Sequence, residues 1–459
     1  MSVPRVMLAP SHRTGLAGAV AAAVAEIIGR RERQVRYHHL GASGPAEACD
    51  RWGGSSFLDP SLYDRETLLH MYELTTRGAD VSLLASTRGL FDDREGAPWT
   101  PADVALTLDS PIVLVLDCRG WGPGLTALVA GFNEQRRDLQ LSGVLLTGVA
   151  DRAHREELRA ALGRTNVPVV GCLYAADAEA VGLTWEGRAP GAWGVPLGDD
   201  LLEVVFQQID VPGLETLAGQ RGFLPRSGGP RKNSHADEPG DAPLVLVAAG
   251  RGFTPWSRDG VEVLRAAGAR IRRLDLIDDD TLPEEAAGLV VAGHVWPDAL
   301  GELAQNYGLM RHLRVRVADG LPTLALGGGV LYFLKRLQDA SGRSHELAGI
   351  LPGSGEVIGD LGEVGYLEVR AERDSVLLRA GETVTGWVAD DAEIHESPVS
   401  RNFPLSVRAP GWAERQSEGA ASVDFLCSRV LVHLASQPLA AARFVTACAR
   451  FAKQEGLGA

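Results

Sequence analysis

The sequence has few cysteines, no long apolar run and no excess of positive charge. Its five cysteines are odd in number and form no C-x-x-C pair, which favours reduced, mostly buried thiols over a disulfide framework. No apolar run approaches the roughly 20 residues of a membrane-spanning helix. The formal net charge is −14, whereas nucleic-acid binding depends on a basic surface. We therefore expect neither membrane insertion nor nucleic-acid binding.

The composition is that of an ordinary globular protein. Hydrophobic residues make up 45% and charged residues 23% of the sequence. A length of 459 residues suits two to four domains. The first residues, Met1–Arg5, lead into a short apolar strand without a signal-peptide pattern. Together with the unpaired cysteines, this pattern predicts a cytoplasmic protein.

Short apolar strands alternate with helices in both halves of the chain. Arg5–Ala9 and Ile112–Asp117 are examples of the predicted strands. Such alternation predicts parallel sheets covered by helices on both faces. Residues 221–243 are rich in glycine, proline and charge and lack an apolar period, which indicates a linker. We therefore expect two α/β domains, at residues 1–220 and 244–459.

One glycine-rich turn stands out in the second half. Leu321–Leu326 is predicted to be a buried strand, Gly327–Gly329 a turn, and the segment from Val330 a helix. Many hydrolases place an exposed nucleophile where a strand passes through a tight turn into a helix. The residue at the apex here is Gly327, so we expect the backbone of such a site without its reactive side chain.

Segments along nearly the whole chain, in their order and spacing, carry a resemblance to a known family. They are Ala9–Val20, Leu58–Leu62, Gly78–Asp92, Pro111–Asp117, Val167–Gly171, Leu326–Leu334, Leu347–Gly353, Glu393–Ser397 and Leu431–Phe444. Together they resemble the cobyrinic acid a,c-diamide synthases. The resemblance implies an N-terminal ATP-binding domain of P-loop type, which activates tetrapyrrole carboxylates. It also implies a C-terminal class I glutaminase-like domain, which releases ammonia from glutamine.

The residues at the implied ATP site depart from the family pattern. A P-loop needs a lysine that reaches the phosphates and a Ser/Thr hydroxyl that binds Mg²⁺. Against the family's run ending G-K-T, these two positions are Leu16 and Ala17. The degenerate loop consists of Arg13, Thr14, Gly15, Leu16 and Ala17. One interpretation is an altered anion site that uses Arg13 or His12 at a helix N-terminus. We favour the other, a structural turn that no longer binds nucleotide.

The carboxylates that the resemblance implies are mostly missing. The Mg²⁺-binding position of the family falls on Leu84–Ser86, and its acidic tetrapyrrole-holding loop on residues 41–46, which lack the aspartates. Asp117 remains at a strand end, where ligands bind in open sheets, although a cap or an ion pair would explain it equally. Asp59 is expected in a structural turn. We therefore expect neither ATP, nor Mg²⁺, nor another metal to bind.

The implied glutaminase site is also altered. Gly327 stands at the family's cysteine position, and without a thiolate no thioester intermediate can form. Leu431 stands at the family's histidine position. A strand expected at Ser428–Ala435 would place Leu431 and His433 on the same face, so His433 is either a remnant of the base or a packed histidine. The candidates for a ligand cleft are Asp59, His294, Trp296 and His395.

These changes fall at the chemical positions, whereas the strands and turns of the family are kept. We interpret the chain as a non-catalytic homologue that binds a tetrapyrrole, or that acts as a subunit or partner of a tetrapyrrole-modifying complex. A homo-oligomer or a heteromer with a related protein is expected. The alternative is an active ATP-dependent tetrapyrrole amidotransferase with relocated groups, such as Arg13 for phosphate and His433 for nitrogen supply. A third interpretation is a purely structural subunit.

Overall fold

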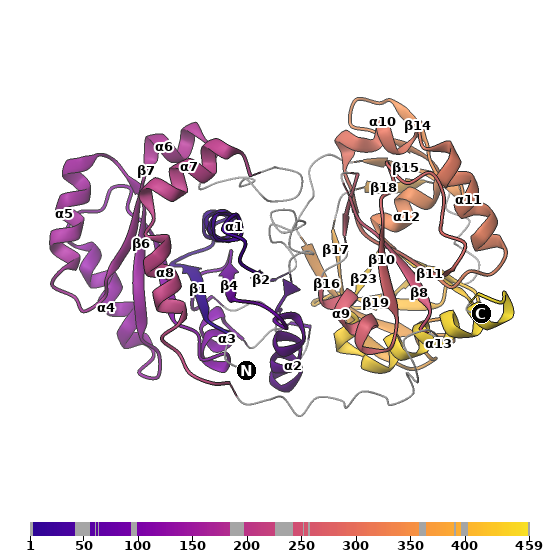
Figure 1. Cartoon of the computed structure of the whole chain (residues 1–459), viewed down its shortest axis with the longest axis horizontal. Coiled ribbons are helices and arrows are strands. Elements are labelled where there is room, and N and C mark those ends of the chain that lie inside the picture. The colour runs from indigo at the N-terminus through magenta and orange to yellow at the C-terminus, as the bar shows by residue number, and fades with distance from the viewer. Residues whose placement is uncertain are drawn as a thin grey trace. The chain divides into compact units, whose positions relative to one another are not determined.

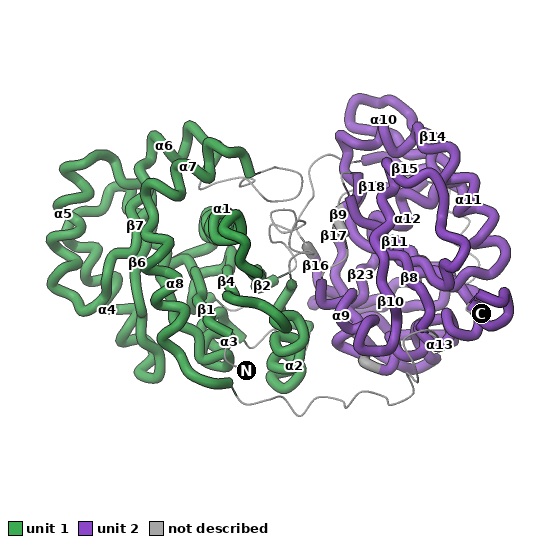
Figure 2. The backbone as a smooth tube through the Cα atoms, in the orientation of Figure 1, with its two compact units in different colours: residues 1–229 green, residues 230–459 purple. Residues whose placement is uncertain are grey.

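The computed structural model shows two compact units, Met1–Gly229 and Pro230–Ala459 (Figure 2). It describes residues 3–41, 56–59, 61–62, 64–92, 99–183, 197–224, 242–250, 252–255, 258–357, 364–389, 392–395 and 403–457. The expected linker at residues 221–243 falls mostly outside these ranges, so its boundaries stay a prediction. Among the described residues, no helix is long and apolar enough to cross a membrane.

Unit 1 contains a seven-stranded sheet of order β3-β2-β4-β1-β5-β6-β7, in which every neighbouring pair is parallel. The strands are β1 (Arg5–Pro10), β2 (Val35–Leu40), β3 (Ser56–Phe57), β4 (Val81–Ser86), β5 (Ile112–Asp117), β6 (Leu141–Val149) and β7 (Val169–Tyr174). Strands β1 and β4 are buried at every position, as expected of a parallel sheet with cover on both faces.

Helices lie on either side of this sheet (Figure 1). They are α1 (Leu16–Gly29), α2 (Arg65–Thr75), α3 (Pro101–Thr107), α4 (Leu125–Gln135), α5 (Arg152–Leu162), α6 (Ala175–Ala180), α7 (Asp199–Gln208) and α8 (Val211–Ala218). The predicted α/β architecture of the first half is thereby confirmed.

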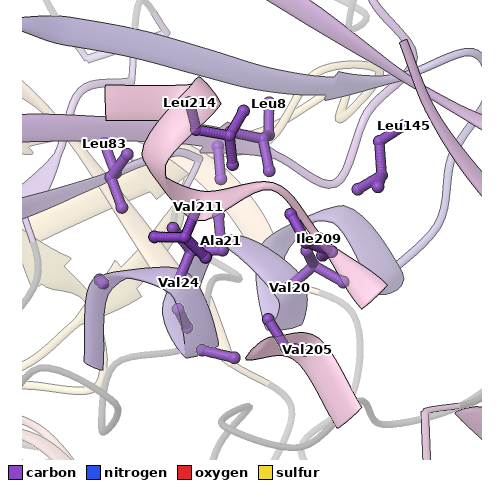
Figure 3. Packing of buried hydrophobic residues seen from close by; sticks show 14 of the residues in the cluster. Leu8, Val20, Ala21, Val24, Leu83, Leu145, Val205, Ile209, Val211 and Leu214 are labelled. Carbon is purple, nitrogen blue, oxygen red and sulfur yellow. The ribbon is translucent and has the colours of Figure 1, made fainter. Parts of the chain in front are cut away.

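Helix α1 is buried along its whole length. Its sequence, LAGAVAAAVAEIIG, has no polar face, and a helix that is apolar all round must be covered all round. Figure 3 shows Val20 and Val24 of α1 beside Val205 of α7 and Val211 of α8, with Leu83 of the sheet nearby. The helix that follows the implied phosphate-binding loop therefore lies inside an apolar cluster of unit 1.

Unit 2 is built on a sheet of order β10-β8-β11-β12-β22-β21, with β9 paired to β11. Its central pairs from β10 to β22 are parallel. The strands are β8 (Leu244–Ala248), β9 (Phe253–Pro255), β10 (Arg270–Leu274), β11 (Ala286–Val295), β12 (Thr323–Gly327), β21 (Ala420–Ala421) and β22 (Phe425–Ser428). The second expected α/β domain thus has the predicted parallel core.

Two smaller sheets complete unit 2, with orders β14-β13-β15-β18 and β20-β19-β16-β17-β23. Their strands are β13 (Leu334–Gln338), β14 (Ser344–Glu346), β15 (Leu351–Val357), β16 (Val364–Ala371), β17 (Thr383–Ala389), β18 (Ala392–His395), β19 (Leu405–Arg408), β20 (Gln416–Glu418) and β23 (Leu431–Val432). The helices are α9 (Arg258–Ala266), α10 (Leu300–Leu303), α11 (Tyr307–Ala318), α12 (Gly328–Phe333) and α13 (Pro438–Gln454), with 3-10 turns η2 (Pro297–Ala299) and η4 (Leu434–Ser436).

The prediction of a single strand at Ser428–Ala435 is wrong. The segment is divided among the end of β22, the two-residue strand β23 and the turn η4. Local hydrogen bonds explain the division: Ser428 Oγ accepts from the amide of Val430 at 3.0 Å, and His433 Nδ1 accepts from the amide of Ala435 at 3.2 Å. His433 caps the turn instead of continuing the strand. Leu431 and His433 therefore do not alternate along one strand, as the sequence had suggested.

Candidate functional site

The turn between β12 and α12 has the backbone of an active-site elbow. Gly327 ends the strand, pairs with Gly293 of β11, and has φ 62° and ψ −122°. A positive φ strongly favours glycine, because a Cβ atom would be strained there. The glycine-rich sequence therefore explains how the sharp turn forms.

The side chain of Leu431 occupies the space beside this turn. A Cβ atom on Gly327 would lie 2.8 Å from Cγ of Leu431 and 2.7 Å from the carbonyl oxygen of Gly293. Leu431 is itself buried. The fold thus brings together the two residues that stand at the implied cysteine and histidine positions, and the pair leaves no room for a side chain on residue 327.

The next two glycines pack against the backbone of β11. A Cβ atom on Gly328 would lie 2.6 Å from the amide nitrogen of Val295, and one on Gly329 would lie 1.8 Å from the carbonyl oxygen of Val291. Contacts below 3.0 Å between such atoms require the backbone to shift. These glycines hold α12 against the sheet, which is a structural role independent of chemistry.

His433 lies in a fully buried cluster with an acidic residue from another element. Its Nε2 is 3.5 Å from Oδ2 of Asp259 in α9, and both side chains have an exposed fraction of 0%. The rings of His433 and Trp387 have centroids 6.1 Å apart. Sequence reasoning missed Asp259, because α9 is distant in sequence and no motif marks it. The geometry is that of a packed histidine.

The other cleft candidates of unit 2 are dispersed. His294 lies near the end of β11, and its backbone borders the glycine turn. A Cβ atom on Gly328 would lie 2.8 Å from Cα of His294. Trp296 follows, with its amide donating to the carbonyl oxygen of Gly252 at 3.2 Å. His395 belongs to the separate four-stranded sheet, where its Nε2 is 3.9 Å from a carboxylate oxygen of Glu356.

The degenerate loop of unit 1 ends in the core. Leu16 is 1% exposed and Ala17 is fully buried, and both belong to the large apolar cluster. The amide of Leu16 donates to Oγ1 of Thr14 at 3.2 Å, and Gly15 is the N-cap residue of α1. Arg13 and His12 are exposed. The side chains at the implied lysine and hydroxyl positions therefore point into apolar packing.

Asp117 is held by an arginine two residues away. The Arg119 guanidinium donates to both carboxylate oxygens: Nε lies 3.1 Å from Oδ1 and 3.0 Å from Oδ2, and Nη2 lies 2.7 Å from Oδ2. The Arg119 amide also donates to Oδ1 at 3.0 Å. Such a bidentate pair satisfies the carboxylate and offsets its charge. Among the described residues, no group of three or more His, Cys, Asp or Glu side chains is arranged to hold a metal ion.

Strand β2 carries two adjacent histidines at the carboxyl edge of the sheet. His38 is hydrogen-bonded at both ring nitrogens, to Thr75 at 3.0 Å and Ser82 at 3.1 Å. His39 donates from Nδ1 to the carbonyl oxygen of Gly41 at 2.8 Å, and burial lowers its pKa to about 4. Asp59 is buried nearby and accepts from the amide of Ser61 at 2.9 Å. The acidic-loop position at residues 42–46 lies outside the described residues.

Comparison with known proteins finds relatives that match most of the chain, although no family model matches it. The chain is 27% identical over 403 residues to the cobyrinate a,c-diamide synthase of Picrophilus torridus, which covers 86% of this chain and 87% of that protein. It is 29% identical over 434 residues to the hydrogenobyrinate a,c-diamide synthase of Mycobacterium bovis, with 89% and 87% covered. Over most of its length the chain is thus similar to cobyrinate and hydrogenobyrinate a,c-diamide synthases.

The family expected from the sequence segments is thereby confirmed over most of the chain. One solved structure, of a glutamine amidotransferase, is similar to 47% of this chain and 100% of its own, with a TM-score of 0.32 and 17% identity. Similarity to the diamide synthases does not bear on whether this chain is active. The loss of catalysis therefore stays a prediction, and the evidence for it comes from the residues at the implied catalytic positions of this chain.

Proposed function

We propose that this member of the diamide synthase family is catalytically silent and binds a tetrapyrrole. The observation that carries the proposal is that Leu431 occupies the space where a side chain on residue 327 would begin. The turn that would present a nucleophile has no side chain, and the space beside it is filled by a buried leucine. Glutamine hydrolysis through a thioester requires a thiolate at this turn and a base beside it. Gly327 supplies no thiolate, and Leu431 supplies no base.

Another cysteine does not supply the missing thiolate. Cys427 lies in β22 and pairs with Ala325 of β12. Ala325 precedes the glycine turn by two residues. It is buried, and burial raises the pKa of its thiol to about 12. Cys118 is likewise buried, with a thiol pKa raised to about 12. A reactive cysteine needs a lowered pKa and access, so these thiols fit structural roles.

The nucleotide site supports the same proposal independently. Lysine and hydroxyl groups at the positions of Leu16 and Ala17 would contact phosphate and Mg²⁺, yet these residues are packed in the core of unit 1. The remaining strand-end carboxylate, Asp117, is bound by Arg119. Tetrapyrrole binding is proposed because the relatives act on cobyrinate or hydrogenobyrinate, as their names state, while the family's sheets and turns are kept.

The test combines two activity assays with one binding assay. The purified full chain is incubated with glutamine, with ATP·Mg²⁺, and with both plus cobyrinate, and glutamate, phosphate and amidated product are measured. The Picrophilus torridus relative, which is named a cobyrinate a,c-diamide synthase, serves as the positive control. We expect no turnover by this chain, and a saturable change in the visible spectrum on titration with cobyrinate. Glutaminase or ATPase turnover would overturn the silent assignment, and an unchanged spectrum would overturn tetrapyrrole binding.

A homo-oligomer, or a heteromer with an active relative, is part of the same proposal. The mass of the chain in solution, alone and mixed with the relative, tests it. A monomer in both cases would contradict this part of the proposal and leave ligand binding to be judged by the titration.

A further inference from the structure

Helices α7 and α11 carry charge of opposite sign. The sequence of α7, DDLLEVVFQQ, has three carboxylates and no basic residue, whereas that of α11, YGLMRHLRVRVA, has three arginines and no carboxylate. Helix α7 belongs to unit 1 and α11 to unit 2 (Figure 2). In a chain with a net charge of −14, a helix with arginines and no carboxylate stands out. The two helices therefore favour partners of opposite charge.

The exposed face of α11 combines positive charge with an aromatic ring. Arg311 and Arg314 are exposed, and Tyr307, at the start of the helix, has an exposed fraction of 66%. The remaining arginine is bound within unit 2, since Nη2 of Arg316 donates to the carbonyl oxygen of Ala286 at 2.8 Å. Within the part of the chain that the structure describes, no carboxylate forms an ion pair with Arg311 or Arg314. This face thus suits an acidic partner.

The exposed face of α7 combines negative charge with an aromatic ring. Asp200 and Glu203 are exposed, and Phe206 has an exposed fraction of 54%. The third carboxylate is taken up within unit 1, because Asp199 lies 2.8 Å from the guanidinium of Arg30. No cation among the described residues forms an ion pair with Asp200 or Glu203. This face thus suits a basic partner.

The charges and the ring are spaced alike on the two helices. Along the helix axis, Asp200 lies about 9 Å from Phe206. On α11, Arg314 lies about 10 Å from Tyr307. One further charged residue lies between these positions on each helix. The ring stands toward the C-terminal end of α7 but at the N-terminal end of α11, so antiparallel packing sets ring against ring and carboxylate against arginine.

We propose that α7 of one copy of the chain packs antiparallel against α11 of a second copy, hereafter the α7–α11 interface. Phenylalanine, tyrosine and arginine are enriched at protein interfaces. Because each chain carries both faces, a two-fold dimer makes the contact twice, which matters since one pair of short helices is small beside a standard interface of roughly 1,600 Å². The inference rests on the homo-oligomer of the proposed function and names its contact surface. The proposed pairs are Asp200 with Arg314, Glu203 with Arg311, and Phe206 with Tyr307.

Charge reversal on α11 tests the interface. Analytical ultracentrifugation of the full chain over a concentration series gives the dissociation constant of the dimer. We expect the wild-type chain to form a dimer. The α11 variant, Arg311→Glu with Arg314→Glu, should raise the dissociation constant at least about a hundredfold, because carboxylates then face carboxylates. The matched control is Arg159→Glu with Arg164→Glu, on exposed arginines at the end of α5. It changes the net charge equally and should keep the dimer.

Mixing two variants shows whether the faces meet between chains. The α7 variant, Asp200→Lys with Glu203→Lys, carries two positive faces, and the α11 variant carries two negative ones. Each should be monomeric alone. In a mixed dimer every α7–α11 contact again joins opposite charges, so an equimolar mixture should recover the dimer. Pairing of α7 with α11 inside one chain could not be recovered in this way.

Thiol crosslinking gives a measurement that does not depend on charged variants. Phe206→Cys combined with Tyr307→Cys places two exposed thiols on opposite sides of the interface. A short bismaleimide should join the double variant into a covalent dimer and leave either single variant uncrosslinked. Because both positions are exposed, these substitutions should not disturb the core.

Any of four results would overturn the α7–α11 interface: a monomeric wild-type chain, a dimer of unchanged affinity in either charge variant, a mixture that stays monomeric, or no specific crosslink between chains. A monomeric wild-type chain also removes the homo-oligomer from the proposed function. A wild-type dimer that charge reversal does not affect keeps the homo-oligomer and rejects only this surface. Titration of the same variants with cobyrinate reports tetrapyrrole binding separately, so its failure leaves the interface standing.

Discussion

Substitution of Gly327 by alanine should destabilise unit 2, and a second substitution should recover part of the loss. A non-glycine residue at φ 62° and ψ −122° costs about 2 kcal/mol in backbone strain. The added Cβ also overlaps Leu431 and the carbonyl oxygen of Gly293, at about 2 kcal/mol more. We therefore expect Gly327→Ala to lower the free energy of unfolding by about 4 kcal/mol.

Leu431→Ala alone should cost about 3 kcal/mol, because it leaves a cavity in a buried region. It removes Cγ and Cδ2, which are the leucine atoms that the new Cβ would meet. The double variant should therefore lose about 2 kcal/mol less than the sum of the single losses. The remaining loss reflects the backbone strain, the overlap with Gly293 and the cavity.

Peptide-resolved hydrogen exchange in urea measures the free energy for β12 and β22 apart from unit 1, which avoids treating a two-unit chain as one transition. The matched control combines Gly327→Ala with Leu309→Ala, a buried leucine of α11, and should be additive within about 0.5 kcal/mol. Additivity in the Leu431 pair, or a loss below about 1 kcal/mol for Gly327→Ala, would refute the reasoning that Leu431 fills the nucleophile position.

Three further predictions concern the altered nucleotide loop, the buried histidine and the thiols. Leu16→Lys should not restore ATP binding and should destabilise unit 1 by about 3 kcal/mol or more, because it buries a charge in an apolar cluster. Urea unfolding and ATP titration measure these two effects. Tight ATP binding by the variant would contradict the prediction. The pKa of His39 falls from 6.5 to about 4 on folding, so the unfolded chain binds the proton more readily and stability should decrease as pH falls from 6.5 to 4, by about 3 kcal/mol. His39→Gln should flatten that part of the stability curve, and an unchanged pH profile would argue against a buried neutral ring. Cys118, Cys172, Cys427 and Cys448 are buried with raised thiol pKa values, so at pH 8 iodoacetamide should label their peptides only after denaturation, and rapid native labelling of Cys427 would revive it as a nucleophile candidate.

The sequence predicted the parts of the molecule that depend on local pattern. Apolar strands such as Ile112–Asp117 indicate a sheet that is covered on both faces, and the structure buries this strand from Ile112 to Leu116. The glycines at 327–329 predicted a sharp turn, because only glycine accepts that backbone without strain. Where a local hydrogen bond competes with strand pairing, as at His433, the pattern failed.

By itself, then, the sequence determined two α/β folds, the absence of a thiol at residue 327 and the apolar character of residues 16 and 17. The tertiary structure decided what surrounds those positions. It placed Leu431 against Gly327, Asp259 beside His433, and an unbonded His39 nitrogen at the edge of the first sheet. The physical reason is that a strand or turn depends on residues close in the chain, whereas a contact, a burial or a missing hydrogen-bond partner depends on residues that only folding brings together.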